Sequence, residues 1–147
     1  MSDIIGIDHI YITVSDMARS EIFYDCAMKI MGFRKTTFTL DGEPHIQYFN
    51  RHFGYVLRPA RLTHVHDPYS PGLHHLCFRV DSVADVVRVS DDLRASGINT
   101  TPPQLHPDYA PDYWATYFHD PDGIRLEVTH YRQERRERHD QWDHIQR

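Results

Sequence analysis

The sequence predicts an α+β protein built from two tandem βαβββ modules. One observation is a repeated stretch: Gly6–Val14 and Gly72–Val80 each run Gly, apolar, polar, His, and then alternate apolar and polar residues up to Val. A second is that each stretch is followed by a capped amphipathic helix that ends at a Gly, either Gly32 or Gly97. The third is that strand-like segments follow each helix, so the plan strand-helix-strand-strand-strand occurs twice.

The two histidines of the repeated stretches occupy equivalent positions, 66 residues apart, at His9 and His75. Side chains of a strand alternate between its faces, so each His shares a face with the polar members of its strand. The apolar members, such as Ile12 and Phe78, are expected to face a helix. Two such half-sheets facing each other would bring both imidazoles into a common cleft.

The first half is expected to contain one helix and four strands. Ser15-Asp16 offers an N-cap for the helix, whose apolar residues recur at three- and four-residue spacing. Asp41-Gly42 is typical of a tight hairpin turn. The predicted elements are a strand over 4–14, a helix over 17–31, and strands over 33–40, 46–50 and 55–58.

The second half repeats this plan after a proline-containing connector over 59–71. Asp81-Ser82 offers the N-cap, and Asp120-Pro121-Asp122-Gly123 has the pattern of a type I turn. Gly54–Arg58 aligns with Gly123–Glu127, so Arg58 is expected to be the counterpart of Glu127. The predicted elements are strands over 73–80 and 98–101, a helix over 83–96, a loop over 102–112, and strands over 113–118 and 124–130.

Composition indicates one globular domain over residues 1–131, with halves at about 4–59 and 72–131. The 147 residues are 40% hydrophobic and 25% charged, as in ordinary globular proteins. Residues 132–147 form an Arg- and Glu-rich tail that is expected to be a solvated helix. The formal net charge of −5 argues against nucleic acid as a partner, and no apolar run has the length of a membrane span. Two cysteines and the absence of a signal-peptide pattern predict free thiols and a cytoplasmic location.

The doubled plan, with a His at the start of each half and Asp-Pro-Asp-Gly-Ile-Arg-Leu-Glu near the end, resembles the vicinal oxygen chelate superfamily. This group includes glyoxalase I, extradiol dioxygenases, fosfomycin-resistance enzymes and bleomycin-resistance proteins. The resemblance covers about residues 4 to 131, and Asp8-His9, Phe23-Tyr24 and Gly32-Phe33 also fit it. It implies a cupped sheet around one divalent metal ion.

The resemblance places the metal ligands of the family on His9, His75 and Glu127. A fourth ligand position falls on Arg58, which has no lone pair to offer a metal. The remaining two His and one Glu suit Fe, Mn, Zn or Ni and leave coordination positions open for water and substrate. His74 is the competitor of His75, but strand alternation turns it to the opposite face. Taken singly, each of these residues is more often structural than a ligand.

Three further residues are candidates for substrate binding. Arg58 can clamp an anionic group, or it can form an ion pair with a nearby Asp or Glu. Tyr113 and Tyr117 flank the cleft strand and can line a pocket. The Pro-rich loop that contains His106 and Tyr109 can lie over the mouth of the cleft, but a plain surface loop is the expectation.

The predicted function is a metal-dependent enzyme that chelates a small oxygen-rich substrate, as a lyase or isomerase or as an extradiol-type dioxygenase. The alternative is a metal-free protein that sequesters a drug or ligand, of the bleomycin-resistance type. The resemblance also implies a homodimer, in which the metal ligands come from one chain or from two.

Overall fold

The computed structural model describes residues 2–145, and they form two compact units. One unit contains the chain up to His66 together with the turn Asp120–Gly123. The other contains Asp67–His119 and the chain from Ile124 onward. The predicted α+β class and its two βαβββ modules are confirmed.

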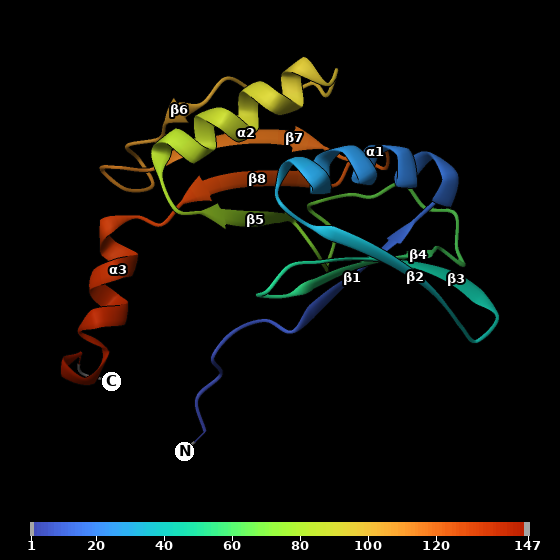
Figure 1. Cartoon of the computed structure of the whole chain (residues 1–147), viewed down its shortest axis with the longest axis horizontal. Coiled ribbons are helices and arrows are strands. Elements are labelled where there is room, and N and C mark those ends of the chain that lie inside the picture. Colours follow the sequence, from blue (N-terminus) through green and yellow to red (C-terminus); the bar gives the residue numbers. More distant parts are fainter. Residues whose placement is uncertain (1, 146–147) are drawn as a thin grey trace. The chain divides into compact units, whose positions relative to one another are not determined.

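The first unit is a mixed four-stranded sheet that packs against one helix (Figure 1). Its strands lie in the order β1-β4-β3-β2, with β1 parallel to β4 and the other neighbours antiparallel. Its elements are β1 (His9–Val14), α1 (Met17–Ile30), β2 (Arg34–Leu40), β3 (Glu43–Phe49) and β4 (Gly54–Pro59).

The termini of α1 and the first hairpin form where the sequence predicts them. The Asp16 carboxylate accepts a hydrogen bond from the Arg19 backbone N–H at 3.0 Å and so caps the helix. Gly32, with φ of +84°, ends it. Asp41 and Gly42 both have positive φ, 53° and 76°, as a type I′ turn requires between twisted strands.

Three buried tyrosines are central to the core of this unit. Tyr24 of α1, Tyr48 of β3 and Tyr55 of β4 are each at most 2% exposed. Tyr24 and Tyr55 share a hydrogen bond of 2.9 Å between their hydroxyl groups, which satisfies polar atoms that would otherwise be costly to bury. Tyr55 and Leu57 therefore face α1, and Gly54, Val56 and Arg58 lie on the opposite face of the sheet.

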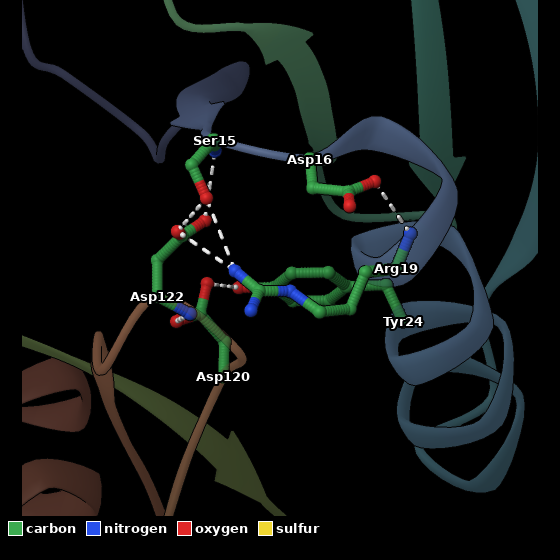
Figure 2. Close-up of polar contacts among 6 residues, drawn as sticks. All are labelled: Ser15, Asp16, Arg19, Tyr24, Asp120 and Asp122. Atoms are coloured by element: carbon green, nitrogen blue, oxygen red, sulfur yellow. Dashed lines mark hydrogen bonds and ion pairs between the residues drawn. The ribbon is translucent and has the colours of Figure 1, made fainter. Parts of the chain in front are cut away.

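The turn Asp120–Gly123 belongs to this first unit although it lies far along the chain. Its Asp120 carboxylate accepts a hydrogen bond from the Tyr24 hydroxyl at 2.9 Å. Asp122 accepts hydrogen bonds from the Ser15 backbone N–H, at 3.0 Å, and from the Ser15 hydroxyl. Figure 2 shows how these acidic side chains meet the N-terminal turns of α1.

The second unit repeats the arrangement of the first. Its strands lie in the order β5-β8-β7-β6, with β5 parallel to β8, and α2 covers one face (Figure 1). Ser82 caps α2 by accepting from the Asp85 N–H, and Gly97 follows its end with φ of +86°. The elements are β5 (His75–Val80), α2 (Val83–Ala95), β6 (Gln104–Leu105), β7 (Trp114–His119) and β8 (Arg125–His130).

The predicted alignment of the last strands of the two halves is wrong by two residues. In the first unit His9 pairs with Gly54, so Tyr11 pairs with Val56. In the second, His75 pairs with Arg125 and Cys77 with Glu127. The counterpart of Glu127 is therefore Val56 and not Arg58.

Two strand predictions near the edges are also wrong. No strand forms over residues 98–101, because Pro102 and Pro103 lack the N–H groups that a ladder requires. Instead, the Thr101 side chain accepts a hydrogen bond from the Tyr117 N–H at 2.9 Å, and β6 forms later, inside the predicted loop. β1 begins at His9 rather than near Ile4, since its partner β4 begins opposite His9.

The charged C-terminal segment forms α3 (Gln133–Asp140) and a short 3₁₀ turn, η1 (Trp142–His144). The predicted pairs are present, with Arg138 bound to Glu134 and Gln133 to Glu137, both at 2.8 Å. No helix within residues 2–145 combines the length and the apolar character that crossing a membrane would require.

Candidate functional site

The buried carboxylate of Glu127 is the centre of the candidate site in the second unit. Glu127 lies in the middle of β8 and is only 2% exposed. Its cross-strand neighbours are Cys77 on β5 and Tyr117 on β7, on the face of the sheet away from α2. A carboxylate at this depth needs polar partners, because burying an unpaired charge is costly.

Two tyrosines donate to this carboxylate, and a histidine lies beside its other oxygen. Oε1 of Glu127 accepts hydrogen bonds from the hydroxyl groups of Tyr113, at 2.6 Å, and Tyr117, at 3.3 Å. Oε2 lies 3.2 Å from Nε2 of His75. The sequence predicted all four residues for the site, and substrate binding by the two tyrosines stays a prediction.

Burial and the neighbouring carboxylate keep both phenols protonated. Desolvation, followed by the hydrogen bond to Glu127, raises the pKa of Tyr113 well above its usual value. Desolvation and the charge of Glu127 do the same to the pKa of Tyr117. Both hydroxyl groups therefore act as hydrogen-bond donors that fix the orientation of Glu127 near neutral pH.

His75 is oriented by the residue that precedes it. Its Nδ1 lies 2.7 Å from Nδ1 of His74, so one ring donates and the other accepts. If His75 donates, its Nε2 presents a lone pair beside Oε2 of Glu127. Such an outer hydrogen bond to the second ring nitrogen is usual for a metal-binding histidine.

The separation of these two atoms fits a shared metal ion. Metal–nitrogen and metal–oxygen bonds of about 2.1 Å place neighbouring ligand atoms about 3.0 to 3.4 Å apart, depending on geometry. The 3.2 Å between Nε2 of His75 and Oε2 of Glu127 lies inside this range. Two of the three predicted ligands are thus brought together, with open space on the side of His75, whose side chain is 37% exposed.

The third predicted ligand, His9, starts β1 of the first unit. Its Nδ1 lies 2.7 Å from Oδ1 of Asp8, and its side chain is 54% exposed. In both His9 and His75, Nδ1 therefore contacts the side chain of the preceding residue, at 2.7 Å in each case. Within either unit, the described residues include no cluster of three His, Cys, Asp or Glu side chains able to hold a metal, so the role of His9 stays a prediction.

Arg58 already has a partner in the first unit. Its guanidinium forms an ion pair with Glu43, which also binds Arg61 at 2.7 Å. The expected alternative, an ion pair with a nearby acidic residue, is therefore present. Binding of an anionic substrate by Arg58 stays a prediction.

Several further residues lie near Glu127. His106 and Tyr109 of the predicted surface loop stack at 5.4 Å between ring centroids, and the His106 ring lies 5.6 Å from that of Tyr117. Arg125 lies over Tyr117 at 4.3 Å, and Arg132 lies over Tyr113 at 4.4 Å. Strand alternation does place Arg125 on the face of Glu127, and the loop of His106 and Tyr109 was an alternative cover for the cleft, but nothing in the sequence pattern marks Arg132.

Known proteins resemble this chain over most of its length. The profile of the Glyoxalase/Bleomycin resistance protein/Dioxygenase superfamily matches residues 6–128. The uncharacterized protein YqjT of Bacillus subtilis (strain 168) is 27% identical over 124 residues, which cover 82% of this chain and 94% of that protein.

Solved structures agree with this match. A glyoxylase/bleomycin resistance protein/dioxygenase domain from Frankia sp. EAN1pec is 27% identical, with a TM-score of 0.72, over 88% of this chain and all of that one. A lactoylglutathione lyase from Agrobacterium tumefaciens shares the fold at 20% identity, with a TM-score of 0.60, over 88% of this chain and 94% of that one. The chain belongs to the Glyoxalase/Bleomycin resistance protein/Dioxygenase superfamily.

Proposed function

We propose that this protein is a divalent-metal-dependent enzyme that acts on a small oxygen-rich substrate. His75 and Glu127 hold the ion, and His9 is the third ligand. The observation that carries the proposal is the convergence of Nε2 of His75 and Oε2 of Glu127 at 3.2 Å, while two tyrosines fix the other carboxylate oxygen. A purely structural carboxylate would not need an open side next to an exposed imidazole.

Each residue has a defined task in this proposal. When bound, the ion would act as a Lewis acid toward adjacent substrate oxygens. Tyr113 and Tyr117 hold Glu127 in one orientation, and His74 selects the tautomer of His75 that leaves Nε2 free. Two imidazoles and one carboxylate leave coordination positions open, which suits Fe, Mn, Zn or Ni.

The reaction class that we propose is that of a lyase or isomerase, or of an extradiol-type dioxygenase. Both classes are named among the relatives, by a lactoylglutathione lyase and by the dioxygenase members of the superfamily.

We also propose a homodimer, which light scattering would detect as twice the 17.4 kDa mass of the chain.

Titration of the purified, metal-stripped protein with Mn(II) and Zn(II) tests the proposal. We expect one ion per chain for the wild type, and loss of at least about tenfold in affinity for His75→Ala, Glu127→Gln and His9→Ala. His64→Ala is the control, because His64 is an exposed residue of the connector. Wild-type affinity in all three variants would contradict the metal site. A metal-free protein that still binds an aromatic ligand would support the sequestering alternative.

A further inference from the structure

Arg132 is the one arginine that the structure buries within residues 2–145. It is 7% exposed and links the end of β8 to the start of α3. Its Nε is fully buried and has no hydrogen-bond partner among the described residues. The contact found for its guanidinium is the face of the Tyr113 ring, 4.4 Å from the ring centroid.

The position of Arg132 is fixed by its neighbours in the chain. The Tyr131 N–H donates to the Val80 carbonyl at 2.8 Å and extends the pairing of β8 with β5. On the other side, the Arg132 carbonyl accepts from the N–H of Arg135 at 3.0 Å and of Arg136 at 3.1 Å as α3 begins. The backbone is therefore held on both sides of a side chain that turns inward.

The guanidinium lies beside the candidate site. The hydroxyl of the tyrosine that it covers donates to Oε1 of Glu127. Its charge also acts on the thiol of Cys77, the cross-strand neighbour of Glu127, where it opposes the increase in the pKa of that thiol. Arg132 nevertheless forms no ion pair with any described acidic residue.

A second arginine, Arg125, adds positive charge beside the candidate site. Arg125 is the cross-strand neighbour of His75, and its guanidinium lies over Tyr117 at 4.3 Å from the ring centroid. The two tyrosines that hold Glu127 are thus each covered by an arginine. The arginines elsewhere that pair with acids, such as Arg58, Arg88 and Arg138, are half-buried or exposed.

A buried Nε–H of a guanidinium without an acceptor is costly, because this donor loses water and gains no hydrogen bond in return. The cation–π contact with Tyr113 replaces only part of that loss. An oxyanion that accepts from Nε–H and from the neighbouring Nη–H would supply the missing acceptor, and the oxygen pairs of carboxylate and phosphonate groups match this fork of donors.

We propose that Arg132, assisted by Arg125, binds a carboxylate or phosphonate group of the substrate next to the Glu127–His75 pair. This inference rests on the proposed function in one respect, namely that the same substrate is chelated by the metal. It narrows the substrate class to small anionic chelators. It also gives the start of the C-terminal segment a role in substrate recognition.

Matched probes test the proposal. Oxamate and oxamide are planar chelators of nearly equal size, and only oxamate carries a carboxylate; hydroxymethylphosphonate, which has no carboxylate, represents the phosphonates. Each probe is titrated by calorimetry into the Mn(II)-loaded protein and into the metal-free protein. The variants are Arg132→Gln, which removes the charge, and Arg132→Lys, which keeps the charge but removes the fork. Arg88→Gln on α2, far from Glu127 along the fold, removes an exposed positive charge as the control.

The decisive quantity is the ratio of the dissociation constants of oxamide and oxamate in each variant, because the metal ion itself favours an anionic probe. We expect Arg132→Gln to weaken oxamate binding about tenfold or more and to leave oxamide binding unchanged. The oxamate affinity of Arg132→Lys should lie between those of the wild type and Arg132→Gln. Preference for hydroxymethylphosphonate over oxamate, abolished by Arg132→Gln, would identify the anion as a phosphonate. Thermal unfolding checks that the variants fold. If Arg132→Gln does not fold, the oxamate affinities of Arg132→Lys and of the metal-free wild type test the anion site instead.

The failures of the two proposals are distinguishable. A protein that binds no metal but still binds oxamate through Arg132 would refute the metal site and support the anion site. Wild-type oxamate affinity in a folded Arg132→Gln, or no binding of either anionic probe to the wild type, would overturn the anion site whatever the metal does.

Discussion

The hydrogen bonds around Glu127 give individual residues distinct tasks. Tyr113 donates at 2.6 Å and Tyr117 at 3.3 Å to the same carboxylate oxygen, so Tyr113 should contribute more. Both donors act on a residue that would bind the ion, and not on the ion itself. Outer hydrogen bonds of this kind commonly change metal affinity by about 10- to 100-fold.

Tyr113→Phe should therefore weaken Mn(II) binding about tenfold, because Tyr117 still holds the carboxylate. Isothermal titration of the metal-stripped protein measures this change. Tyr109→Phe serves as the control, since Tyr109 is 63% exposed and its hydroxyl makes no hydrogen bond to Glu127. Equal affinity in the wild type and Tyr113→Phe would show that this hydrogen bond has no part in metal binding.

Cys77 provides a second prediction at this scale, through its reactivity. Cys77 is exposed as a residue, but desolvation of its sulfur by the surrounding side chains, followed by the charge of Glu127, raises the pKa of its thiol to about 12. Only about one thiol in ten thousand is then a thiolate at pH 8, and the thiolate is the reactive form.

In a Cys26→Ser background, iodoacetamide should alkylate folded Cys77 at pH 8 far more slowly than the unfolded chain. The rate should rise with pH beyond 10. Glu127→Gln should increase the rate at pH 8, because it removes a negative charge that raises this pKa. Alkylation of the folded protein as fast as the unfolded chain at pH 8 would mean that the thiol is an ordinary solvated one.

Sequence reasoning succeeded for residues whose position follows from strand alternation. His75 and Glu127 share a face because each lies on a strand with clear apolar alternation, so their proximity could be expected. Arg132 could not, because it lies between a strand and a helix, where no period says which way a side chain turns. Its burial depends on the Tyr113 ring, which arrives from a loop 19 residues earlier.

Among the elements, the turn Asp120–Gly123 makes the strongest contacts that the sequence left unexplained. Asp120 is 5% exposed and accepts a hydrogen bond from the hydroxyl of Tyr24 (Figure 2). The same hydroxyl lies 2.9 Å from that of Tyr55. Desolvation and then the neighbouring Tyr55 and Asp120 raise the pKa of Tyr24 well above its usual value. The phenol therefore stays a donor, and the turn is tied to α1.

Asp120→Asn should lower the free energy of unfolding by about 1 to 3 kcal/mol, since it replaces a charge-assisted hydrogen bond in a buried position. Urea denaturation measures the change. Asp91→Asn, an exposed residue of α2, should change it by less than about 0.5 kcal/mol. If Asp120→Asn lowers the free energy of unfolding no more than this control, the hydrogen bond of Asp120 does not stabilise the fold.

The alignment of the last strands shows where sequence reasoning about elements fails. Gly54 and Gly123 look equivalent, but they have different tasks. Gly54 starts β4, and a Cβ there would lie 2.9 Å from Nε2 of Gln47. Gly123 lies before β8, in a turn that requires its φ of +82°. One glycine permits a close approach and the other a positive φ, so aligning them shifted the strands by two residues.

The duplication defines the molecule as a whole, and each unit has its own sheet, helix and core. The two are nevertheless joined by the turn Asp120–Gly123, which packs within the first unit while it connects β7 and β8 of the second. The plan of both units was predictable, since it repeats in the sequence. That a turn from one half would complete the core of the other was not, because no local pattern encodes it.

We therefore expect the two units to unfold together. Trp114 and Trp142 both lie in the second unit, so tryptophan fluorescence reports on that unit, whereas far-UV circular dichroism reports on both. The two urea transitions should coincide in the wild type. In Asp120→Ala the circular dichroism transition should begin at a lower urea concentration. Separate transitions in the wild type would show that the turn does not couple the units.

Anomalous scattering would show whether Glu127 and His75 bind one metal ion. In crystals of the protein grown with Mn(II), we predict an anomalous peak about 2.0 to 2.3 Å from both Nε2 of His75 and Oε2 of Glu127, with a second imidazole, that of His9, as a further ligand. If the site is fully ordered but shows no such peak at Mn(II) concentrations that saturate the protein in solution, His75 and Glu127 do not bind the ion together.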